Sequence, residues 1–259
     1  MHGPRLAVLA LAFGLAAGPP SWSAPPAQPS SAARSVDPAA VKALSDMSAY
    51  LQTLSSFELT SKTSLDLVTR DDEKIQLDGV GTYKVRKPNA FVIDIASDDW
   101  NRRYIYDGRQ FTLFAPKLGY FAQVPAPGSI RETISEVESR FGISLPLDDL
   151  FRWSEPGGAR ADLLQSGFLV GVETIDGVKT NHYAFRENKI DWQIWIQQGD
   201  QPLPRKLVII DRRDPTAPAY AARLSWTLNP ALGDDVFAFQ PPQDAKRIRM
   251  VLQEMGATR

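Results

Sequence analysis

The sequence predicts a mainly β protein built on a single curved antiparallel sheet. Hydrophobic residues alternate with polar ones over most of residues 57–124 and again over 168–228. Turn signals such as Asp107-Gly108 separate these runs, and only a few short segments have a helical period. Because strands follow strands with few helices between them, an antiparallel sheet is favoured over alternating βαβ units. A sheet of about eleven strands must curl, so we expect an unclosed β-barrel with helices as plug or lid.

The first helix is predicted to begin at Asp37-Pro38, with Asp as N-cap and Pro at the first helical position. Apolar residues then follow at three- and four-residue steps, which places them on one face of the helix. They are Val41, Leu44, Met47, Leu51 and Leu54.

Eleven runs with strand character follow, and a helical insertion divides them. The first six cover residues 57–67, 75–85, 91–95, 104–106, 110–115 and 118–124. In the insertion, Ser129 and Glu132 form a capping box for a helix that ends at Gly142, and a second helical turn covers residues 146–153. The last five runs cover residues 168–172, 182–187, 192–197, 205–211 and 219–228.

The amino terminus has the parts of a cleavable signal peptide. A basic start is followed by the apolar run 6–18 and by small residues up to Ser23. A membrane anchor is the alternative, but a spanning helix needs about 20 apolar residues and this run is shorter. We therefore predict a signal peptide over residues 1–23, a flexible Pro/Ser/Ala-rich linker over 24–36 and one folded domain over 37–255. The mature chain is expected to be exported and soluble.

Composition excludes several classes of function. The formal net charge is −1 and no long basic stretch occurs, which disfavours nucleic acid as a partner. There is no cysteine, so neither a disulfide nor a lipid-modified cysteine is expected, and a zinc site of ordinary composition cannot be built. No nucleotide-binding or hydrolase motif occurs. We expect no cofactor and no metal.

The candidates for catalysis are few. His182 is the one histidine beyond the predicted signal peptide, and a single histidine on a strand is usually hydrogen-bonded or at the surface. Paired carboxylates could serve acid–base chemistry or bind calcium, but aspartates also suit turns and the first turn of helices. The pairs are Asp71-Asp72, Asp98-Asp99, Asp148-Asp149 and Asp234-Asp235. We interpret them as structural and predict a binding protein rather than an enzyme.

Aromatic residues are the more informative signal. Trp192 and Trp195 have opposite parity on one predicted strand, and the strand 110–115 is apolar or neutral on both faces. We therefore expect some aromatic side chains to fill the core and others to face an apolar hollow or a lid. A pocket lined in this way suits lipids and acyl chains.

Four segments resemble the periplasmic lipoprotein-carrier superfamily of LolA and LolB, together with the lipid-sensing domain of RseB. Each segment is a weak motif, but all four occur in the order that the superfamily has. They are Ser55-Ser56-Phe57 after the first helix, the corner Gly81–Phe91 with Lys87-Pro88-Asn89, the hairpin Tyr106–Pro116, and the exit Phe237-Ala238-Phe239-Gln240-Pro241-Pro242. Within this superfamily the chain resembles a group of uncharacterised predicted periplasmic proteins.

The resemblance implies a periplasmic protein that holds an acyl-bearing ligand in a lidded apolar hollow. The carrier has an arginine before the Pro of its corner that ties the lid closed, and Lys87 occupies that position here, so Lys87 is the candidate lid contact. The candidate lining residues are Phe57, Leu59, Tyr83, Phe91, Ile93, Phe111, Leu113, Trp192, Ile194 and Trp226, with Ile134, Val137 and Phe141 on the lid.

The main hypothesis is a monomeric carrier or binding protein for a lipid, lipoprotein or other acyl-bearing molecule. The first alternative is an envelope-stress sensor or scaffold that binds an envelope membrane protein or lipoprotein through the same fold. A lipid-modifying enzyme would instead need a polar cluster inside the hollow around His182, Asp94 or Asp191.

Overall fold

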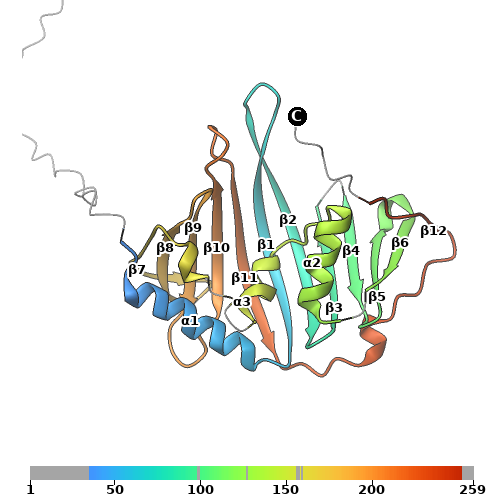
Figure 1. Cartoon of the computed structure of the whole chain (residues 1–259), viewed down its shortest axis with the longest axis horizontal. Coiled ribbons are helices and arrows are strands. Elements are labelled where there is room, and N and C mark those ends of the chain that lie inside the picture. The colour runs from blue at the N-terminus through green and yellow to red at the C-terminus, as the bar shows by residue number, and fades with distance from the viewer. Residues whose placement is uncertain (1–34, 98–99, 127, 156–157, 159, 253–259) are drawn as a thin grey trace, which may run out of the picture. The chain divides into compact units, whose positions relative to one another are not determined.

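The structure, a computed structural model, describes residues 35–97, 100–126, 128–155, 158 and 160–252, and in this part of the chain all strands belong to one sheet (Figure 1). The strands are β1 (Ser56–Val68), β2 (Lys74–Arg86), β3 (Ala90–Ala96), β4 (Asn101–Tyr106), β5 (Gln110–Ala115), β6 (Tyr120–Pro125), β7 (Ser166–Ile175), β8 (Val178–Arg186), β9 (Ile190–Gln197), β10 (Pro204–Asp211), β11 (Ala219–Leu228) and β12 (Lys246–Arg247). The predicted fold class, mainly β with a single unclosed antiparallel sheet of about eleven strands, is confirmed, and the described residues form twelve strands.

The sheet is open rather than closed into a barrel. Its strand order is β12-β6-β5-β4-β3-β2-β1-β11-β10-β9-β8-β7, so β12 and β7 form its two edges. Neighbouring strands pair antiparallel, except that β12 pairs parallel to β6. The twelfth strand was not predicted, because two residues carry no periodic pattern.

The first helix, α1 (Pro38–Thr53), begins as predicted. The backbone N–H of Ala39 donates to the Asp37 carboxylate at 2.8 Å, and Pro38 occupies the first turn. Its buried stripe includes Leu44, Met47 and Leu51, which face the sheet. Burial of this stripe holds α1 against the part of the sheet formed by β7, β8 and β9, and α1 contacts β7 (Figure 1).

The insertion between β6 and β7 forms two further helices, α2 (Ile130–Phe141) and α3 (Asp148–Trp153). The predicted capping box of Ser129 and Glu132 is present, and α2 ends at Gly142 in a left-handed conformation (φ 65°). Short 3-10 turns cover Pro116–Leu118, Ala161–Leu163 and Asp234–Phe237. The first of these delays β6, which begins at Tyr120 instead of 118.

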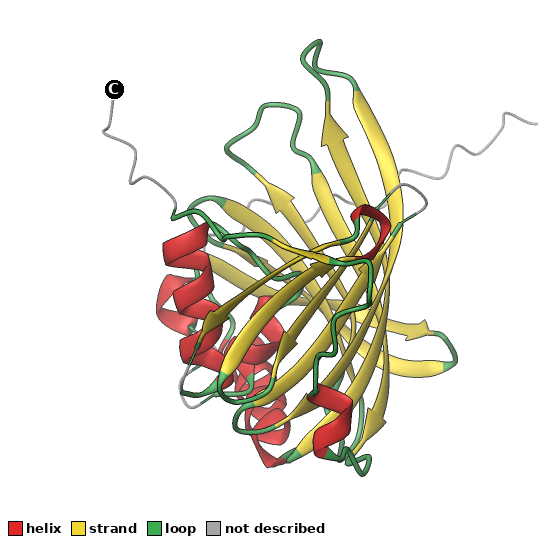
Figure 2. Cartoon of the chain, turned by 90° about the vertical axis from the view of Figure 1, so that its right-hand side faces the viewer, coloured by secondary structure: helices red, strands yellow, loops and turns green. Residues whose placement is uncertain are grey.

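The three α-helices lie on the same face of the sheet (Figure 2). We call this the inner face, and strand parity places Phe57, Tyr83 and Ile194 on it. The opposite face, which we call the outer face, carries residues of the other parity such as Glu58 and Trp195. The main hydrophobic cluster lies between the inner face and the helices.

The chain after β11 builds a second, smaller cluster on the outer face. Phe237 is almost fully buried against Val92 and Ile105, and Phe239 contacts the rings of Phe114 and Phe121. The predicted Phe-x-Phe-x-Pro-Pro exit therefore anchors the chain on β3–β6 before it forms β12.

The predicted domain boundaries remain predictions. The signal peptide 1–23 and the linker up to residue 34 lie outside the described residues, as do Asp98-Asp99. Of the remaining aspartate pairs, Asp71-Asp72 lies in the β1–β2 turn and Asp148-Asp149 in the first turn of α3. Asp234-Asp235 opens a 3-10 turn.

Candidate binding site beneath the helices

All thirteen predicted lining and lid residues lie in one hydrophobic cluster. Ten of them are buried, whereas Leu113, Phe141 and Trp226 are partly exposed and pack against the others. The buried ten are Phe57, Leu59, Tyr83, Phe91, Ile93, Phe111, Ile134, Val137, Trp192 and Ile194. Periodicity therefore placed these side chains on the correct side of each strand and helix, and the fold brings them together.

Strand register explains how the inner face collects these side chains. Phe57, Phe91 and Phe111 belong to one row of directly opposed residues that crosses β1 to β5. Leu59, Ile93 and other predicted residues form the adjacent row. That row runs Trp226, Leu59, Tyr83, Ile93, Tyr104 and Leu113. Because alternate residues face the same way, both rows point toward the helices.

Aromatic rings join the insertion to the sheet at two places. Phe151 of α3 lies 5.9 Å from Phe91 of β3, measured between ring centroids. Trp153 of α3 stacks on Trp192 at 5.9 Å, and Trp192 stacks on Phe185 at 4.4 Å. Phe151, Trp153 and Phe185 were not among the predicted lining residues. Phe185 has the same strand signal as the others, whereas α3 is too short for its period to show which face is buried.

Few polar contacts hold the insertion in place. The hydroxyl of Ser48 on α1 donates to the carbonyl of Trp153 at 2.6 Å. The Tyr83 and Tyr106 hydroxyls donate to the carbonyls of Pro146 (3.3 Å) and Gly128 (2.6 Å). Gln52 of α1 also donates to the Glu155 carbonyl at 3.3 Å. Apart from these bonds and those of the Lys87-Pro88 corner, the contact between helices and sheet is mainly apolar and has little directional preference.

Lys87 lies at the border of the cluster, where it contacts the first helix. Its ammonium donates to the Leu51 carbonyl at the end of α1 at 2.7 Å. Burial lowers the pKa of Lys87, and the nearby Glu155 carboxylate opposes that shift. The Pro88 carbonyl accepts from the first N–H of α2, on Ile130, at 2.9 Å. The corner thus touches both α1 and α2, and a pocket of about 340 Å³ lies beside it.

The Asp149 carboxylate of α3 lies close to the cluster and is mostly buried. Burial, with a smaller contribution from Asp148, raises the pKa of Asp149 on α3 to about 6. Burial also raises the pKa of Tyr220 on β11, and the charge of Asp149 adds to that shift. The Tyr220 hydroxyl is buried without a hydrogen-bond partner among the described residues. The two groups therefore form a polar spot at the edge of an otherwise apolar site.

His182, Asp94 and Asp191, the candidates for a polar cluster inside the hollow of a lipid-modifying enzyme, all lie on the outer face. The His182 ring accepts or donates at 2.9 Å with both Glu173 and Gln193, and it stacks on Trp195 at 3.9 Å. Asp94 pairs with Arg103 on the same face at 2.6 Å. Of the two roles expected for His182, the hydrogen-bonded one fits this geometry, because the side chain is buried and bonded at both ring nitrogens.

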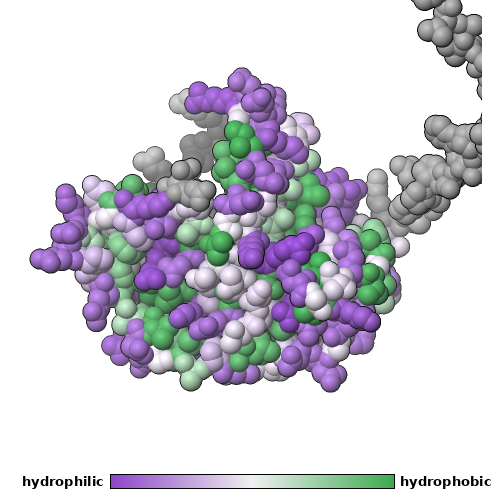
Figure 3. Space-filling model, turned by 180° about the vertical axis from the view of Figure 1, so that it is seen from behind, coloured by the Kyte–Doolittle hydropathy of each residue, from purple (hydrophilic) through white to green (hydrophobic). Residues whose placement is uncertain are grey.

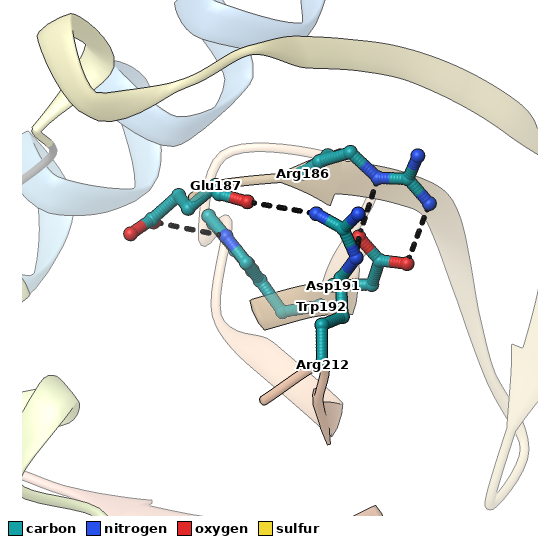
Figure 4. Close-up of polar contacts among 5 residues, drawn as sticks. All are labelled: Arg186, Glu187, Asp191, Trp192 and Arg212. Carbon is teal, nitrogen blue, oxygen red and sulfur yellow. Dashed lines mark hydrogen bonds and ion pairs between the residues drawn. The ribbon is translucent and has the colours of Figure 1, made fainter. Parts of the chain in front are cut away.

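The environment of Asp191 illustrates the separation of the two faces (Figure 4). Asp191 forms ion pairs with Arg186 at 2.7 Å and with Arg212 at 3.6 Å. The adjacent Trp192 points to the inner face, and its indole N–H donates to Glu187 at 3.1 Å. Asp191 is thus an ion-pair residue, whereas its neighbour belongs to the cluster.

The apolar inner face continues beyond the helices. Residues 65–77, at the end of the β1–β2 hairpin, project past β3 and form what we call the arm (Figure 1). Leu65 faces Leu77 and Leu67 faces Ile75, and these four side chains have the inner-face parity. Each is between 43% and 49% exposed. Between the arm and the buried Leu59, the same face carries the small residues Ser61 and Thr63, opposite Gly81 and Gly79.

Two searches among the described residues complete the description of the site. These residues contain no group of three or more His, Cys, Asp or Glu side chains arranged to hold a metal ion. None of the helices that the structure describes is both long and apolar enough to cross a membrane.

The family described as predicted periplasmic protein (DUF2092) matches residues 40–251. The chain belongs to this family. The match spans α1 to the residues after β12, and it confirms the predicted resemblance to a group of predicted periplasmic proteins. No curated protein matches the chain.

Solved structures with a similar fold show low sequence identity to the chain. An uncharacterized conserved protein from Thermus thermophilus has 9% identity and a TM-score of 0.47, covering 82% of this chain and 99% of its own. MucB in its complex with MucA from Pseudomonas aeruginosa has 14% identity and a TM-score of 0.43, covering 81% and 63%. A LolA superfamily protein from Nitrosomonas europaea has 11% identity and a TM-score of 0.36, covering 77% and 97%.

Proposed function

We propose that this family member is a periplasmic carrier or binding protein for an acyl-bearing molecule such as a lipid or lipoprotein. The observation that carries the proposal is the apolar side-chain cluster of the inner face, with further apolar side chains on the arm. These side chains are exposed at Leu67 and Ile75 on the arm and buried at Leu59 and Ile93 under the helices. An acyl chain that first contacts the arm meets no charged group of β1 or β2 before the cluster, because only small uncharged residues of these strands separate the two on this face. They are Ser61, Thr63, Gly79 and Gly81.

Loading requires the insertion to move, because the side chains beneath it fill the site. Phe91, Phe111 and Ile194 have no exposed surface in this structure. Movement of α2 and α3 breaks the hydrogen bonds to the Pro146 and Gly128 carbonyls and exposes apolar side chains. An incoming acyl chain covers that surface again. Burying one methylene is worth about 0.8 kcal/mol, so a 14-carbon chain contributes on the order of 10 kcal/mol to offset opening.

Binding of fatty acids of increasing length tests the proposal. The mature chain is titrated with fatty acids of 8, 10, 12 and 14 carbons that compete with a fluorescent fatty acid. Each added methylene is expected to improve affinity about fourfold, which corresponds to about 0.8 kcal/mol. Acetate serves as the control for the carboxylate alone. Affinity that does not depend on chain length, or no saturable uptake, would contradict the proposal.

A second candidate function is binding of a protein partner, which the edge strand β7 favours. Four apolar residues of β7 are each about half exposed or more: Phe168, Leu169, Val170 and Val172. Along the free edge of β7, the only backbone pairing from the described chain is near Gly167, through Val36 and its neighbours. An apolar edge with unpaired backbone groups can accept an extended segment as an additional strand.

Substitution on this edge separates the two candidates. Val170→Lys/Val172→Lys is expected to abolish capture of an envelope protein while leaving fatty-acid uptake unchanged. Loss of uptake together with capture would instead assign β7 to the same site as the acyl chain.

A further inference from the structure

A row of three cations crosses the outer face on neighbouring strands. Arg223 of β11 lies directly opposite Lys62 of β1 on one side and Lys206 of β10 on the other. Directly paired residues point to the same face, so the three side chains emerge side by side. Figure 3 shows this face, where hydrophilic side chains cover much of the surface below the arm.

The cations line a groove of about 650 Å³. Ser64, Gly79 and Ala221 contribute small side chains or bare backbone to its lining, which leaves room above the sheet. Asp78 is the one carboxylate among the described lining residues. The groove is therefore large enough for a molecule of several heavy atoms and carries a net positive lining.

The positive charge of the groove is poorly neutralised by the protein. Arg223 forms an ion pair with Asp176 at 3.4 Å, but both side chains are about half exposed, so the pair is weak. The Lys206 ammonium lies over the Trp195 ring at 4.1 Å. The pKa of the exposed Glu173 carboxylate is lowered mainly by its hydrogen bond from Trp195, and the Lys206 charge makes a smaller contribution. The Lys62 ammonium has no ion pair or hydrogen bond to another described residue. Like charges on directly opposed residues destabilise a sheet, and a bound anion would remove that cost.

We propose that this groove binds a phosphate-bearing group, either of a soluble phosphate ester or of a phospholipid headgroup. Strands are spaced about 4.8 Å apart, so the three cations arise over a width of roughly 10 Å. A phosphate offers more acceptor oxygens than a carboxylate, and it can use an arginine fork together with two ammonium groups. The chemistry of the lining thus fits phosphate better than a single carboxylate.

This site is separate from the proposed acyl site. The groove opens on the outer face, whereas the cluster under α2 and α3 lies on the inner face. The inference therefore goes beyond the proposed function, and either can fail without the other. Fatty-acid uptake by each groove variant provides the readout that distinguishes them.

The experiment measures binding of two probes to the mature chain. Pyrophosphate is titrated by calorimetry, and vesicles of phosphatidylglycerol or of phosphatidylcholine are tested by co-sedimentation. Lys62→Gln/Arg223→Gln removes two groove charges. Lys42→Gln/Lys84→Gln is the matched control, because Lys42 lies on α1 and Lys84 pairs with Glu58 outside the groove.

The groove variant is expected to bind at least tenfold more weakly, while the matched control stays within twofold of the native chain. Asp78→Asn, which removes the opposing charge, is expected to strengthen binding about threefold. Binding of pyrophosphate alone identifies a soluble ester as ligand, and binding of phosphatidylglycerol vesicles identifies a headgroup. Failure of both probes, or equal loss in both double variants, would overturn the proposal. Thermal melting confirms that each variant is folded.

Discussion

Trp153 of α3 stacks on Trp192 of β9, with ring centroids 5.9 Å apart and ring planes 28° apart. This pair joins the helical insertion to the far half of the sheet, because β11 and β10 separate β9 from the strands that precede the insertion, β1 to β6. The carbonyl of Trp153 also accepts the Ser48 hydroxyl from α1. Trp153 therefore connects three elements, and the stability of the closed site depends on it.

Trp153→Ala is expected to lower the free energy of unfolding by about 3 kcal/mol or more, as for other large-to-small changes in cores. Denaturant unfolding measures this change. The same variant is expected to take up fluorescent fatty acid faster, because α3 loses a main contact with the sheet. Trp100→Ala is the control, since Trp100 is 41% exposed and its removal should change stability by less than about 0.5 kcal/mol. A faster uptake in the control variant would show that tryptophan loss in general, rather than loss of this contact, is responsible.

Asp149→Asn is expected to change how stability depends on pH. The pKa of Asp149 is raised from 3.8 to about 6, so the folded state holds a proton that the unfolded state releases between these values. The contribution of this group is fully present below about pH 4 and is lost as pH rises to about 6. At pH 7.5 the Asn variant should therefore be more stable than the native chain by about 1–3 kcal/mol, and at pH 4 the two should be equal.

Urea unfolding at both pH values checks this prediction, with Asp71→Asn as the control. Asp71 lies exposed in the β1–β2 turn, so its variant should follow the native chain at both pH values. If Asp149→Asn gained the same stability at pH 4 as at pH 7.5, the buried charge would not be the cause. The result also bears on loading, because an ionised Asp149 weakens the hold of α3 on the sheet at neutral pH.

Lys87→Met is expected to destabilise the end of α1. The Lys87 ammonium donates to the Leu51 carbonyl at 2.7 Å, whereas the backbone N–H of Leu54 reaches that carbonyl only at 3.4 Å. A cation at this end also interacts favourably with the helix dipole. We expect a loss of about 1–2 kcal/mol and faster amide hydrogen exchange in the last turn of α1. Lys84→Met, at a more exposed position of the preceding strand, should change neither measurement. If amide hydrogen exchange in the last turn of α1 were unchanged in the Lys87 variant, the Lys87–Leu51 hydrogen bond would not stabilise the helix end.

Sequence periodicity predicted the faces of the strands well, but it could not predict depth or closure. The alternation in β1 and β2 placed Leu59 and Leu65 on the same face, and they do share it. Leu59 is buried in the main cluster, whereas Leu65 is 46% exposed on the arm, and the local pattern does not encode this difference. For the same reason, the sequence predicted an apolar lining without showing that α3 fills it.

Opposite parity was also informative where the residue types were ambiguous. Trp192 and Trp195 were expected to have different surroundings, and the structure places Trp192 under α3 and Trp195 on the outer face against His182. The partners of each ring come from strands distant in sequence, so the sequence could separate the two tryptophans but could not name their contacts. The cation row could not be predicted for the same reason. Lys62, Arg223 and Lys206 are distant in sequence and lie side by side only because of the strand register.

Leu67→Ser/Ile75→Ser on the arm is expected to slow acyl uptake while leaving the fold intact. These side chains face each other on the exposed end of the inner face, so their loss removes apolar contact from the first part of the entry path. Losing about 1.4 kcal/mol of that contact corresponds to about a tenfold lower rate of fluorescent fatty-acid uptake in stopped flow. Leu118→Ser/Leu163→Ser removes two exposed leucines away from the arm and should leave the rate unchanged. Because the arm extends beyond the main cluster, both double variants should melt close to the native chain. Equal rates in all three proteins would mean that the acyl chain does not enter over the arm.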